Sequence, residues 1–199
     1  MNNEIEWEKT YSGSHDSHKN KYPSELIISW VKKNYSNKIE LEKRKEYKVL
    51  DLGCGWGNNL KFLKEEGFDS FGIDFSKSAV DSLKDEFGEN VKTMNFKYLD
   101  FDNNTFDFII DRSSIQHNTK ENISIIHNEI FRVLKDGGKF YSIMVKNGDN
   151  GFFMELLNEE EVKSSLSNYS KVKIDYLSKT TDGGKMIHEN FLIEAIKGL

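Results

Sequence analysis

Apolar and polar positions along the middle of the chain follow two periodicities, one typical of strands and one typical of helices. Short runs rich in β-branched and aromatic residues predict strands over residues 47–52, 70–75, 95–101, 105–111 and 139–145. Apolar residues three and four positions apart predict helices over residues 58–67, 76–88 and about 121–134. Strands that alternate with helices are typical of an open, mostly parallel sheet with helices on both faces.

Residues that typically begin or end helices lie at the boundaries of these predicted elements. Ser76 is a plausible N-cap for the second helix, and Gly88 a plausible stop. The third helix is expected to break at Gly137-Gly138. Two further strand-like runs flank Asp182-Gly183-Gly184, which predicts an antiparallel hairpin. We therefore expect an α/β fold with a doubly wound, mostly parallel seven-stranded sheet and a C-terminal antiparallel hairpin.

The N-terminal stretch lies outside this alternation. Residues 1–22 are polar but contain Trp7, Tyr11, His15 and His18, which a purely solvated tail does not need. A helix over residues 23–35 follows, and the mixed-charge run over 37–48 is expected to be a solvated connection. We expect residues 1–22 to be a lid or substrate segment and residues 23–199 to be one domain.

Composition narrows the class of protein. The 199 residues include a single cysteine, so neither an intrachain disulfide nor a Cys-based zinc site is expected. The net charge of −5 disfavours nucleic acid as a partner. No signal peptide or apolar stretch of membrane length is present, so we expect a cytoplasmic protein without a membrane partner. Abundant Lys and Asn predict an AT-rich bacterial genome.

The candidate chemistry begins at the loop that follows the first predicted strand. This loop carries Asp51, Gly53, Gly55 and Gly57, at the turn where doubly wound sheets bind ligands. A dinucleotide loop would need the spacing G-x-G-x-x-G, and its pyrophosphate would be repelled by the aspartate. The alternate glycines and the acid instead suit a ligand that carries an ammonium or sulfonium charge.

Five motifs in order resemble those of class I S-adenosylmethionine-dependent methyltransferases, especially the small, metabolite-type enzymes. They are VLDLGCGWG, GIDFS, YLDFD, FDFIIDRSSIQHN and RVLKDGGKF, and they lie between residues 47 and 145. The resemblance implies a Rossmann-like methyltransferase fold, S-adenosylmethionine as cofactor and S-adenosylhomocysteine as product.

The resemblance also implies roles for residues in these motifs. The glycine loop would pass under the methionine part of the cofactor, and Asp74 would hydrogen-bond both ribose hydroxyls. Phe75 would pack against the adenine, Asp100 would accept from its amino group, and the Phe101 amide would meet the ring. Asp74 and Asp100 also fit a plainer role as turn formers at strand ends. The full expected cofactor set is Asp51, Gly53, Cys54, Gly55, Gly57, Asn59, Asp74, Phe75, Asp100, Phe101 and Asp111.

The acceptor side is expected just beyond the fourth predicted strand. His117 is suited to act as a general base near neutral pH, or it caps the following helix. Arg112 would hold an anionic group of the substrate or pair with a nearby acid such as Asp111, and Gln116 would hydrogen-bond substrate or cofactor.

Two segments are candidate lids over the acceptor. The first is residues 7–22, from which Tyr11 and Tyr22 would contact the substrate, and the second is the loop over 146–157. His15 and His18 also fit as plain surface residues. No two histidines have the spacing H-x-x-x-H on a confidently predicted helix, so no metal is expected.

The predicted function is transfer of a methyl group to a hydroxyl, or less favourably an amine, of a small polar metabolite such as a sugar or nucleotide-linked sugar. The tetrapeptide NPPY of amino-methylating nucleic-acid enzymes is replaced here by DRSS, residues 111–114. The alternatives are a methyltransferase of protein or RNA, and a binding module that holds the cofactor without transferring its methyl group. A monomer or homodimer fits the length.

Overall fold

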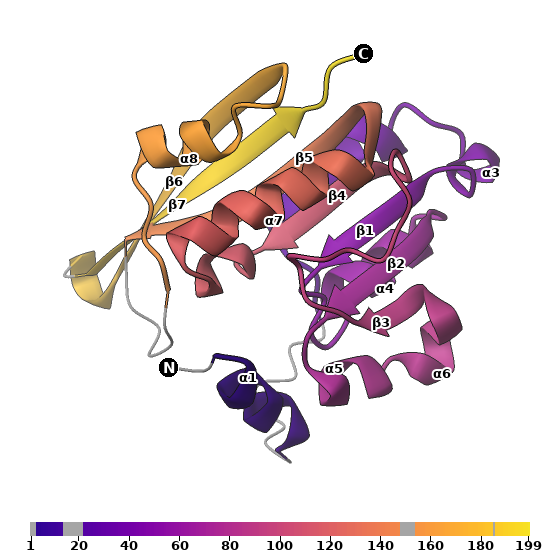
Figure 1. Cartoon of the computed structure of the whole chain (residues 1–199), viewed down its shortest axis with the longest axis horizontal. Coiled ribbons are helices and arrows are strands. Elements are labelled where there is room, and N and C mark those ends of the chain that lie inside the picture. The colour runs from indigo at the N-terminus through magenta and orange to yellow at the C-terminus, as the bar shows by residue number, and fades with distance from the viewer. Residues whose placement is uncertain (1–2, 14–21, 148–153, 185) are drawn as a thin grey trace. The chain divides into compact units, whose positions relative to one another are not determined.

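The computed structural model describes residues 3–13, 22–147, 154–184 and 186–199 of the chain (Figure 1). The chain divides into two compact units. We call Asn2–Asn95 the N-terminal unit and Phe96–Leu199 the C-terminal unit.

The N-terminal unit is built on three parallel strands. These are β1 (Lys48–Leu52), β2 (Asp69–Asp74) and β3 (Val91–Thr93), in the order β3-β2-β1. Strand β1 runs in register with β2 from the pair Lys48–Asp69 to the pair Leu52–Ile73. All residues of β1 after Lys48 are buried, which is typical of a parallel strand covered on both faces.

Short helices surround these strands. They are α1 (Asn3–Ser12), α2 (Glu25–Val31), the π-helix η2 (Lys32–Ser36), α3 (Leu41–Arg44), α4 (Asn58–Glu65), α5 (Lys77–Asp81), α6 (Lys84–Phe87) and the 3-10 helix η3 (Gly88–Asn90). The N-cap at Ser76 is confirmed, because its side chain accepts a hydrogen bond from the Ala79 amide at 3.2 Å. The single helix expected over 76–88 is wrong, since α5 ends at Asp81 and the helix resumes as α6 at Lys84.

The C-terminal unit joins a parallel pair of strands to a long antiparallel hairpin. Its strands are β4 (Phe106–Arg112), β5 (Leu134–Asn147), β6 (Lys171–Thr181) and β7 (Met186–Ile196), in the order β4-β5-β7-β6. The short helix η5 (Asp182–Gly184) turns the chain between β6 and β7, so the predicted hairpin is confirmed. The remaining helices are η4 (Ile115–His117), α7 (Lys120–Val133) and α8 (Glu159–Ser165).

The boundary between the third helix and the fifth strand differs from the prediction. Helix α7 ends at Val133 and β5 begins at the next residue, before the glycine pair rather than after it. Gly137 lies inside this strand with a φ of 74°, and the pairing with β4 shifts register over the same stretch. The glycines therefore mark an irregularity within the strand and not the end of the helix.

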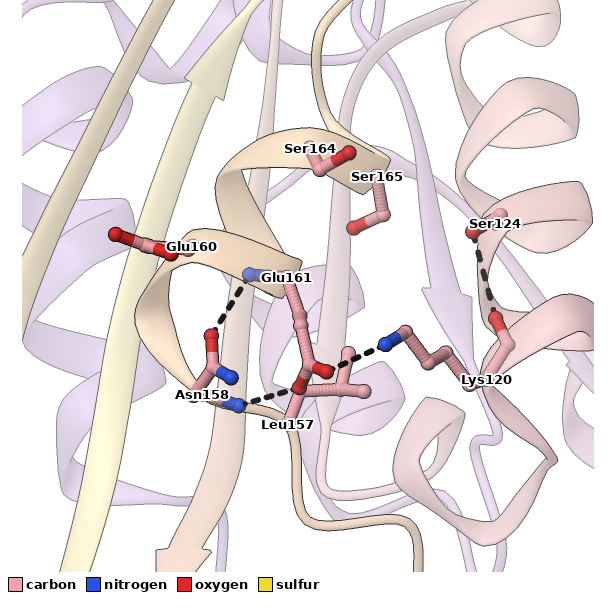
Figure 2. Close-up of a pocket in the computed structure, with 8 residues that line it drawn as sticks. All are labelled: Lys120, Ser124, Leu157, Asn158, Glu160, Glu161, Ser164 and Ser165. Carbon is pink, nitrogen blue, oxygen red and sulfur yellow. Dashed lines mark hydrogen bonds and ion pairs between the residues drawn. The ribbon is translucent and has the colours of Figure 1, made fainter.

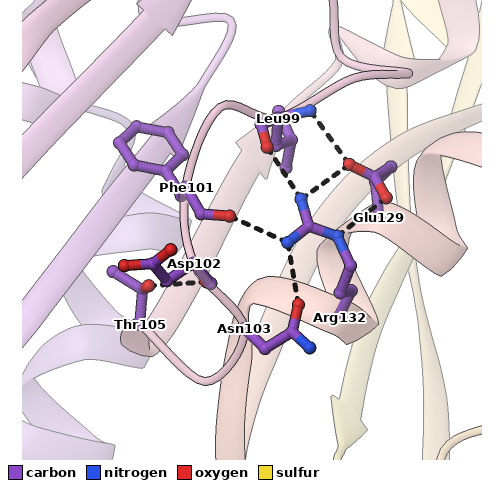
Figure 3. Close-up of polar contacts among 7 residues, drawn as sticks. All are labelled: Leu99, Phe101, Asp102, Asn103, Thr105, Glu129 and Arg132. Atoms are coloured by element: carbon purple, nitrogen blue, oxygen red, sulfur yellow. Dashed lines mark hydrogen bonds and ion pairs between the residues drawn. The ribbon is translucent and has the colours of Figure 1, made fainter.

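The third predicted strand, over residues 95–101, is wrong. The strand is β3, three residues long and just upstream, and the following segment is held by side chains instead of a neighbouring strand. Arg132 donates to the Leu99 and Phe101 carbonyls at 2.7 and 2.8 Å, and the Glu129 carboxylate accepts from the Leu99 amide at 2.9 Å (Figure 3). Because these backbone groups already have partners, the segment does not need to pair as a strand.

The expected fold class is confirmed: an α/β fold with a seven-stranded, mostly parallel sheet and a C-terminal antiparallel hairpin. Among the described residues, no helix combines the length and apolar character needed to cross a bilayer.

Candidate active site

The glycine loop between β1 and α4 has the backbone conformation that its sequence predicts. Gly53, Gly55 and Gly57 have φ values of 76°, 50° and 77°, in the left-handed region where other residues are strained. The Gly53 and Cys54 amides both donate to the Ile73 carbonyl, at 2.8 and 3.0 Å. The loop is therefore fixed against the end of β2, and Gly55 and Gly57 within it are buried.

Asp74 ties the end of β2 to this loop. One of its carboxylate oxygens accepts from the Gly55 amide at 3.0 Å, and the other accepts from the Ser76 amide at 2.9 Å. Burial raises the pKa of Asp74, and the hydrogen bonds from Ser76, Gly55 and Phe75 oppose that rise. Each carboxylate oxygen can accept more than one hydrogen bond, so both can still receive a donor from a ligand.

Asp51, which lies in β1 just before the loop, and Cys54 within the loop are both buried. Burial raises the pKa of the Cys54 thiol well above its usual value, and the Asp51 and Asp74 carboxylates raise it further. The thiol packs in an apolar cluster that includes Leu60 and Leu83. Cys54 therefore stays protonated and acts as a small core residue, not as a nucleophile.

Helix α1 brings Tyr11 directly onto the glycine loop. A Cβ atom built on Gly55 would lie only 2.5 Å from the Tyr11 hydroxyl oxygen, so only glycine allows this approach. The Tyr11 ring also packs edge-on against Trp56, with centroids 5.3 Å apart. Burial, followed by the Asp74 charge, raises the pKa of Tyr11, so its hydroxyl stays neutral at physiological pH.

Other residues expected near this loop lie elsewhere in the N-terminal unit. The Asn59 side chain accepts from the Ser24 amide at 2.9 Å and joins the start of α4 to the start of α2. Tyr22 is 78% exposed. His15 and His18 lie outside the described residues.

In the C-terminal unit, Asp111 organises the end of β4. One oxygen of its carboxylate accepts from the Ser114 and Ile115 amides at 2.9 and 3.3 Å, and the other accepts from the Ser142 hydroxyl at 2.6 Å. Complete burial raises the pKa of Asp111 to about 6, against these hydrogen bonds. The side chain thus shapes the turn that leads from β4 into η4.

Gln116 is fully buried and fixes the same turn to the end of β5. Its side-chain oxygen accepts from the Val145 amide at 2.7 Å, and its side-chain nitrogen donates to the Met154 sulfur at 3.0 Å. Its carbonyl accepts from the Glu155 amide at 2.7 Å. The next residue, His117, is 7% exposed, whereas Arg112 at the end of β4 is exposed. The sequence motif does not reveal these hydrogen bonds of Gln116, because the residues that form them with Gln116 lie far along the chain.

Phe101 lies in the turn that Arg132 supports (Figure 3), and Asp100 precedes it in the chain. Asp100 is exposed, and the Phe101 ring packs edge-on against Phe106 with centroids 4.9 Å apart. Arg132 also pairs with Glu129 at 2.9 Å, and its guanidinium donates to the Asn103 side chain at 2.9 Å. Arg132 is a supporting residue that sequence reasoning missed.

A pocket of about 370 Å³ lies between α7 and α8 of the C-terminal unit (Figure 2). Glu161 pairs there with Lys120, and Glu161 and Asn158 form the capping box of α8. The lining residues are Lys120, Ser124, Leu157, Asn158, Glu160, Glu161, Ser164 and Ser165. None of the residues predicted to bind cofactor or substrate is among them, so this pocket is not the candidate site.

Comparison with known proteins matches residues 49–138 to the family described as methyltransferase domain. An uncharacterized protein of Methanocaldococcus jannaschii, MJ0638, is 28% identical over 172 residues, which cover 85% of this chain and 67% of that protein. The sterol 24-C-methyltransferase erg-4 of Neurospora crassa is 24% identical over 76% of this chain and 43% of its own length. These relatives are archaeal and fungal, and the expected bacterial origin stays a prediction.

A solved structure has the same fold. It is an S-adenosylmethionine-dependent methyltransferase from Archaeoglobus fulgidus, with a TM-score of 0.69 and 17% identity. The match covers 97% of this chain and 99% of that one. The matched family spans both the glycine loop and the turn after β4. Over residues 49–138 the chain is therefore similar in sequence to methyltransferase domains, and nearly its whole length has the fold of a solved S-adenosylmethionine-dependent methyltransferase.

Proposed function

We propose that this protein transfers the methyl group of S-adenosylmethionine to a hydroxyl of a small polar metabolite, such as a sugar or nucleotide-linked sugar. The observation that supports S-adenosylmethionine as the cofactor is the hydrogen bond between the Gly55 amide of the glycine loop and the Asp74 carboxylate. The two oxygens of this buried carboxylate are held at the end of β2 by the Gly55 and Ser76 amides. A buried carboxylate beside a glycine loop suits a cationic ligand that bears hydroxyl donors.

The residues present fit this cofactor. Asp51 and Asp74 are two buried carboxylates at the loop, and they favour a sulfonium charge over a pyrophosphate. Gly55 has no side chain, and the Tyr11 hydroxyl of α1 lies against it. When bound, the cofactor supplies an electrophilic methyl group. We assign the ribose hydroxyls to Asp74, and by similarity to the family the adenine to Phe75, Asp100 and Phe101.

On the acceptor side, we assign the general base to His117. The turn after β4 that carries it is fixed by the buried Asp111 and Gln116, which supports a defined position for the ring. A base held in place can take the proton of a hydroxyl as the methyl group is transferred. Because the Gln116 amide is already engaged by Val145 and Met154, we assign substrate contact to Arg112 and Tyr11 instead.

The cofactor assignment is tested by calorimetric titration with S-adenosylmethionine, with NAD as the competing ligand. Asp74→Ala is expected to weaken cofactor binding at least about tenfold, because a charge-assisted contact worth roughly 1.5–3 kcal/mol is lost. Asp69→Ala is the matched control, since it removes the same charge from the other end of β2. Equal affinity of both variants would contradict the ribose assignment, and binding of NAD alone would favour a dehydrogenase.

The acceptor assignment is tested by methyl transfer to a panel of hydroxyl and amine metabolites, total RNA and protein. Transfer to a small hydroxyl compound is expected, and His117→Ala should slow it by about a hundredfold. Cofactor affinity should be unchanged in that variant. His188→Ala, on β7, is the matched control. Full activity of His117→Ala would remove the base from the mechanism, and transfer to RNA or protein alone would replace the proposed acceptor.

A further inference from the structure

Helix α1 is attached to the start of α5 by one carboxylate. Glu8 accepts from the Ser78 hydroxyl at 2.5 Å and from the Ser76 hydroxyl at 2.7 Å. It also accepts from the Ser78 amide at 3.4 Å. These donors lie about 70 positions away in the sequence, so Glu8 joins two distant parts of the N-terminal unit.

The clasp formed by Glu8, Ser76 and Ser78 needs an ionised acceptor. The Ser76 hydroxyl already accepts from the Ala79 amide as the N-cap of α5, so its one proton is left for Glu8. Ser78 donates its hydroxyl proton as well. The hydrogen bonds from Ser78 and then Ser76 lower the pKa of Glu8, which keeps the carboxylate charged at physiological pH.

The clasp and the glycine loop are connected through a ring of contacts. The Ser76 hydroxyl donates to the Glu8 carboxylate, and the Ser76 amide donates to Asp74 at 2.9 Å. Asp74 in turn binds the Gly55 amide, and the α carbon of Gly55 faces the Tyr11 hydroxyl. Tyr11 and Glu8 are three residues apart on α1, and therefore lie on one face of that helix.

We propose that Glu8 is a positioning residue of the cofactor site, which holds α1 over the glycine loop so that Tyr11 closes over bound S-adenosylmethionine. This inference rests on the proposed function, because it takes the ligand of the loop to be that cofactor. The cofactor enters and leaves when the clasp opens. Glu8 thereby sets how long the cofactor stays bound, without touching it.

Glu8→Gln keeps the shape of the side chain and removes its charge. The dissociation rate of S-adenosylhomocysteine is expected to rise about five- to tenfold, since hydrogen bonds to a charged acceptor are about twice as strong as neutral ones. Stopped-flow tryptophan fluorescence measures this rate, because Trp7 and Trp56 both lie beside Tyr11. The Michaelis constant for the cofactor should rise, with kcat nearly unchanged.

Glu6→Gln is the matched control. It removes the same charge from the same helix, but the Glu6 carboxylate pairs with Lys9 within α1 at 3.0 Å. Ser78→Ala should reproduce the effect of Glu8→Gln, and the double variant should be no faster than either single variant. Unchanged dissociation in Glu8→Gln would overturn the proposal. Tighter binding would overturn it as well, because α1 would then compete with the cofactor.

A failure of the proposed function gives a different result. In that case the wild-type chain would bind neither S-adenosylmethionine nor its product. The clasp can still be measured by hydrogen exchange of the α1 amides in the full chain without ligand. Faster exchange over residues 3–12 in Glu8→Gln than in Glu6→Gln supports the clasp, and equal exchange overturns it.

Discussion

His127 is a buried histidine whose ring serves the packing of the C-terminal unit. Its Nδ1 atom lies 2.9 Å from the Ser165 hydroxyl, and that hydroxyl donates to the Val162 carbonyl. Nδ1 therefore carries the proton. Within the described part of the chain, Nε2 has no hydrogen-bond partner. Burial lowers the pKa of His127 from 6.5 to about 4, so the ring is neutral in the folded protein.

This shift predicts a pH dependence of stability. Below pH 6.5 His127 is protonated in the unfolded chain, whereas in the folded chain it stays neutral until about pH 4. The free energy of unfolding therefore falls as the pH falls through this window. At pH 5 the loss relative to pH 7 is about 2 kcal/mol. Urea unfolding of His127→Asn should lack this part of the pH slope. His188→Asn is the control, and parallel slopes for the wild type and His127→Asn would contradict the assignment.

At the scale of elements, the turn over residues 97–103 shows why one expected strand is absent. Leu99 in this turn and Phe96 just before it are both buried, and aromatic residues surround them as they would in a strand. A strand, however, needs a partner for its backbone. Arg132 supplies partners for this backbone from α7, more than 30 positions away, and no local pattern reveals that.

Arg132→Ala should therefore destabilise the C-terminal unit. Its guanidinium donates to two carbonyls, to the Asn103 side chain and to Glu129, so its loss leaves several acceptors unpaired (Figure 3). We expect the free energy of unfolding to fall by roughly 2–3 kcal/mol, and the amides over residues 97–103 to exchange faster. The exposed Arg112 gives the control variant for stability. Equal unfolding free energies of Arg132→Ala and Arg112→Ala would contradict this role.

Other elements were predictable to differing degrees. Strands β1, β2, β4 and the β6–β7 hairpin were expected because buried apolar runs and turn residues mark them locally. Helices α1 and α8 were missed. Helix α1 has no continuous apolar stripe and is held by Glu8, and α8 is short and begins with three glutamates. The conformation of the glycine loop was predictable from its glycines, whereas the hydrogen bonds of Gln116 join residues far apart in the sequence.

At the scale of the whole molecule, charge and length bear on the acceptor. A net charge of −5 disfavours the phosphate contacts that nucleic-acid substrates need. The chain spans 67% of the length of its archaeal relative MJ0638 and 43% of the sterol methyltransferase, so those proteins contain sequence without a counterpart here. The methyl acceptor therefore has to be identified with this chain itself and is not inferred from its relatives.

Gln116 has a consequence for which changes of sequence the segment over residues 148–153 can accept. It holds Val145 on one side of residues 148–153, and Met154 and Glu155 on the other. Both flanks are thus fixed to a single residue, whatever sequence joins them. An exchange of the joining segment for one of another length should leave β5 and η4 in place. The hydrogen bonds of Gln116 therefore mark a position at which a segment of another length or sequence could be grafted while β5 and η4 keep their places.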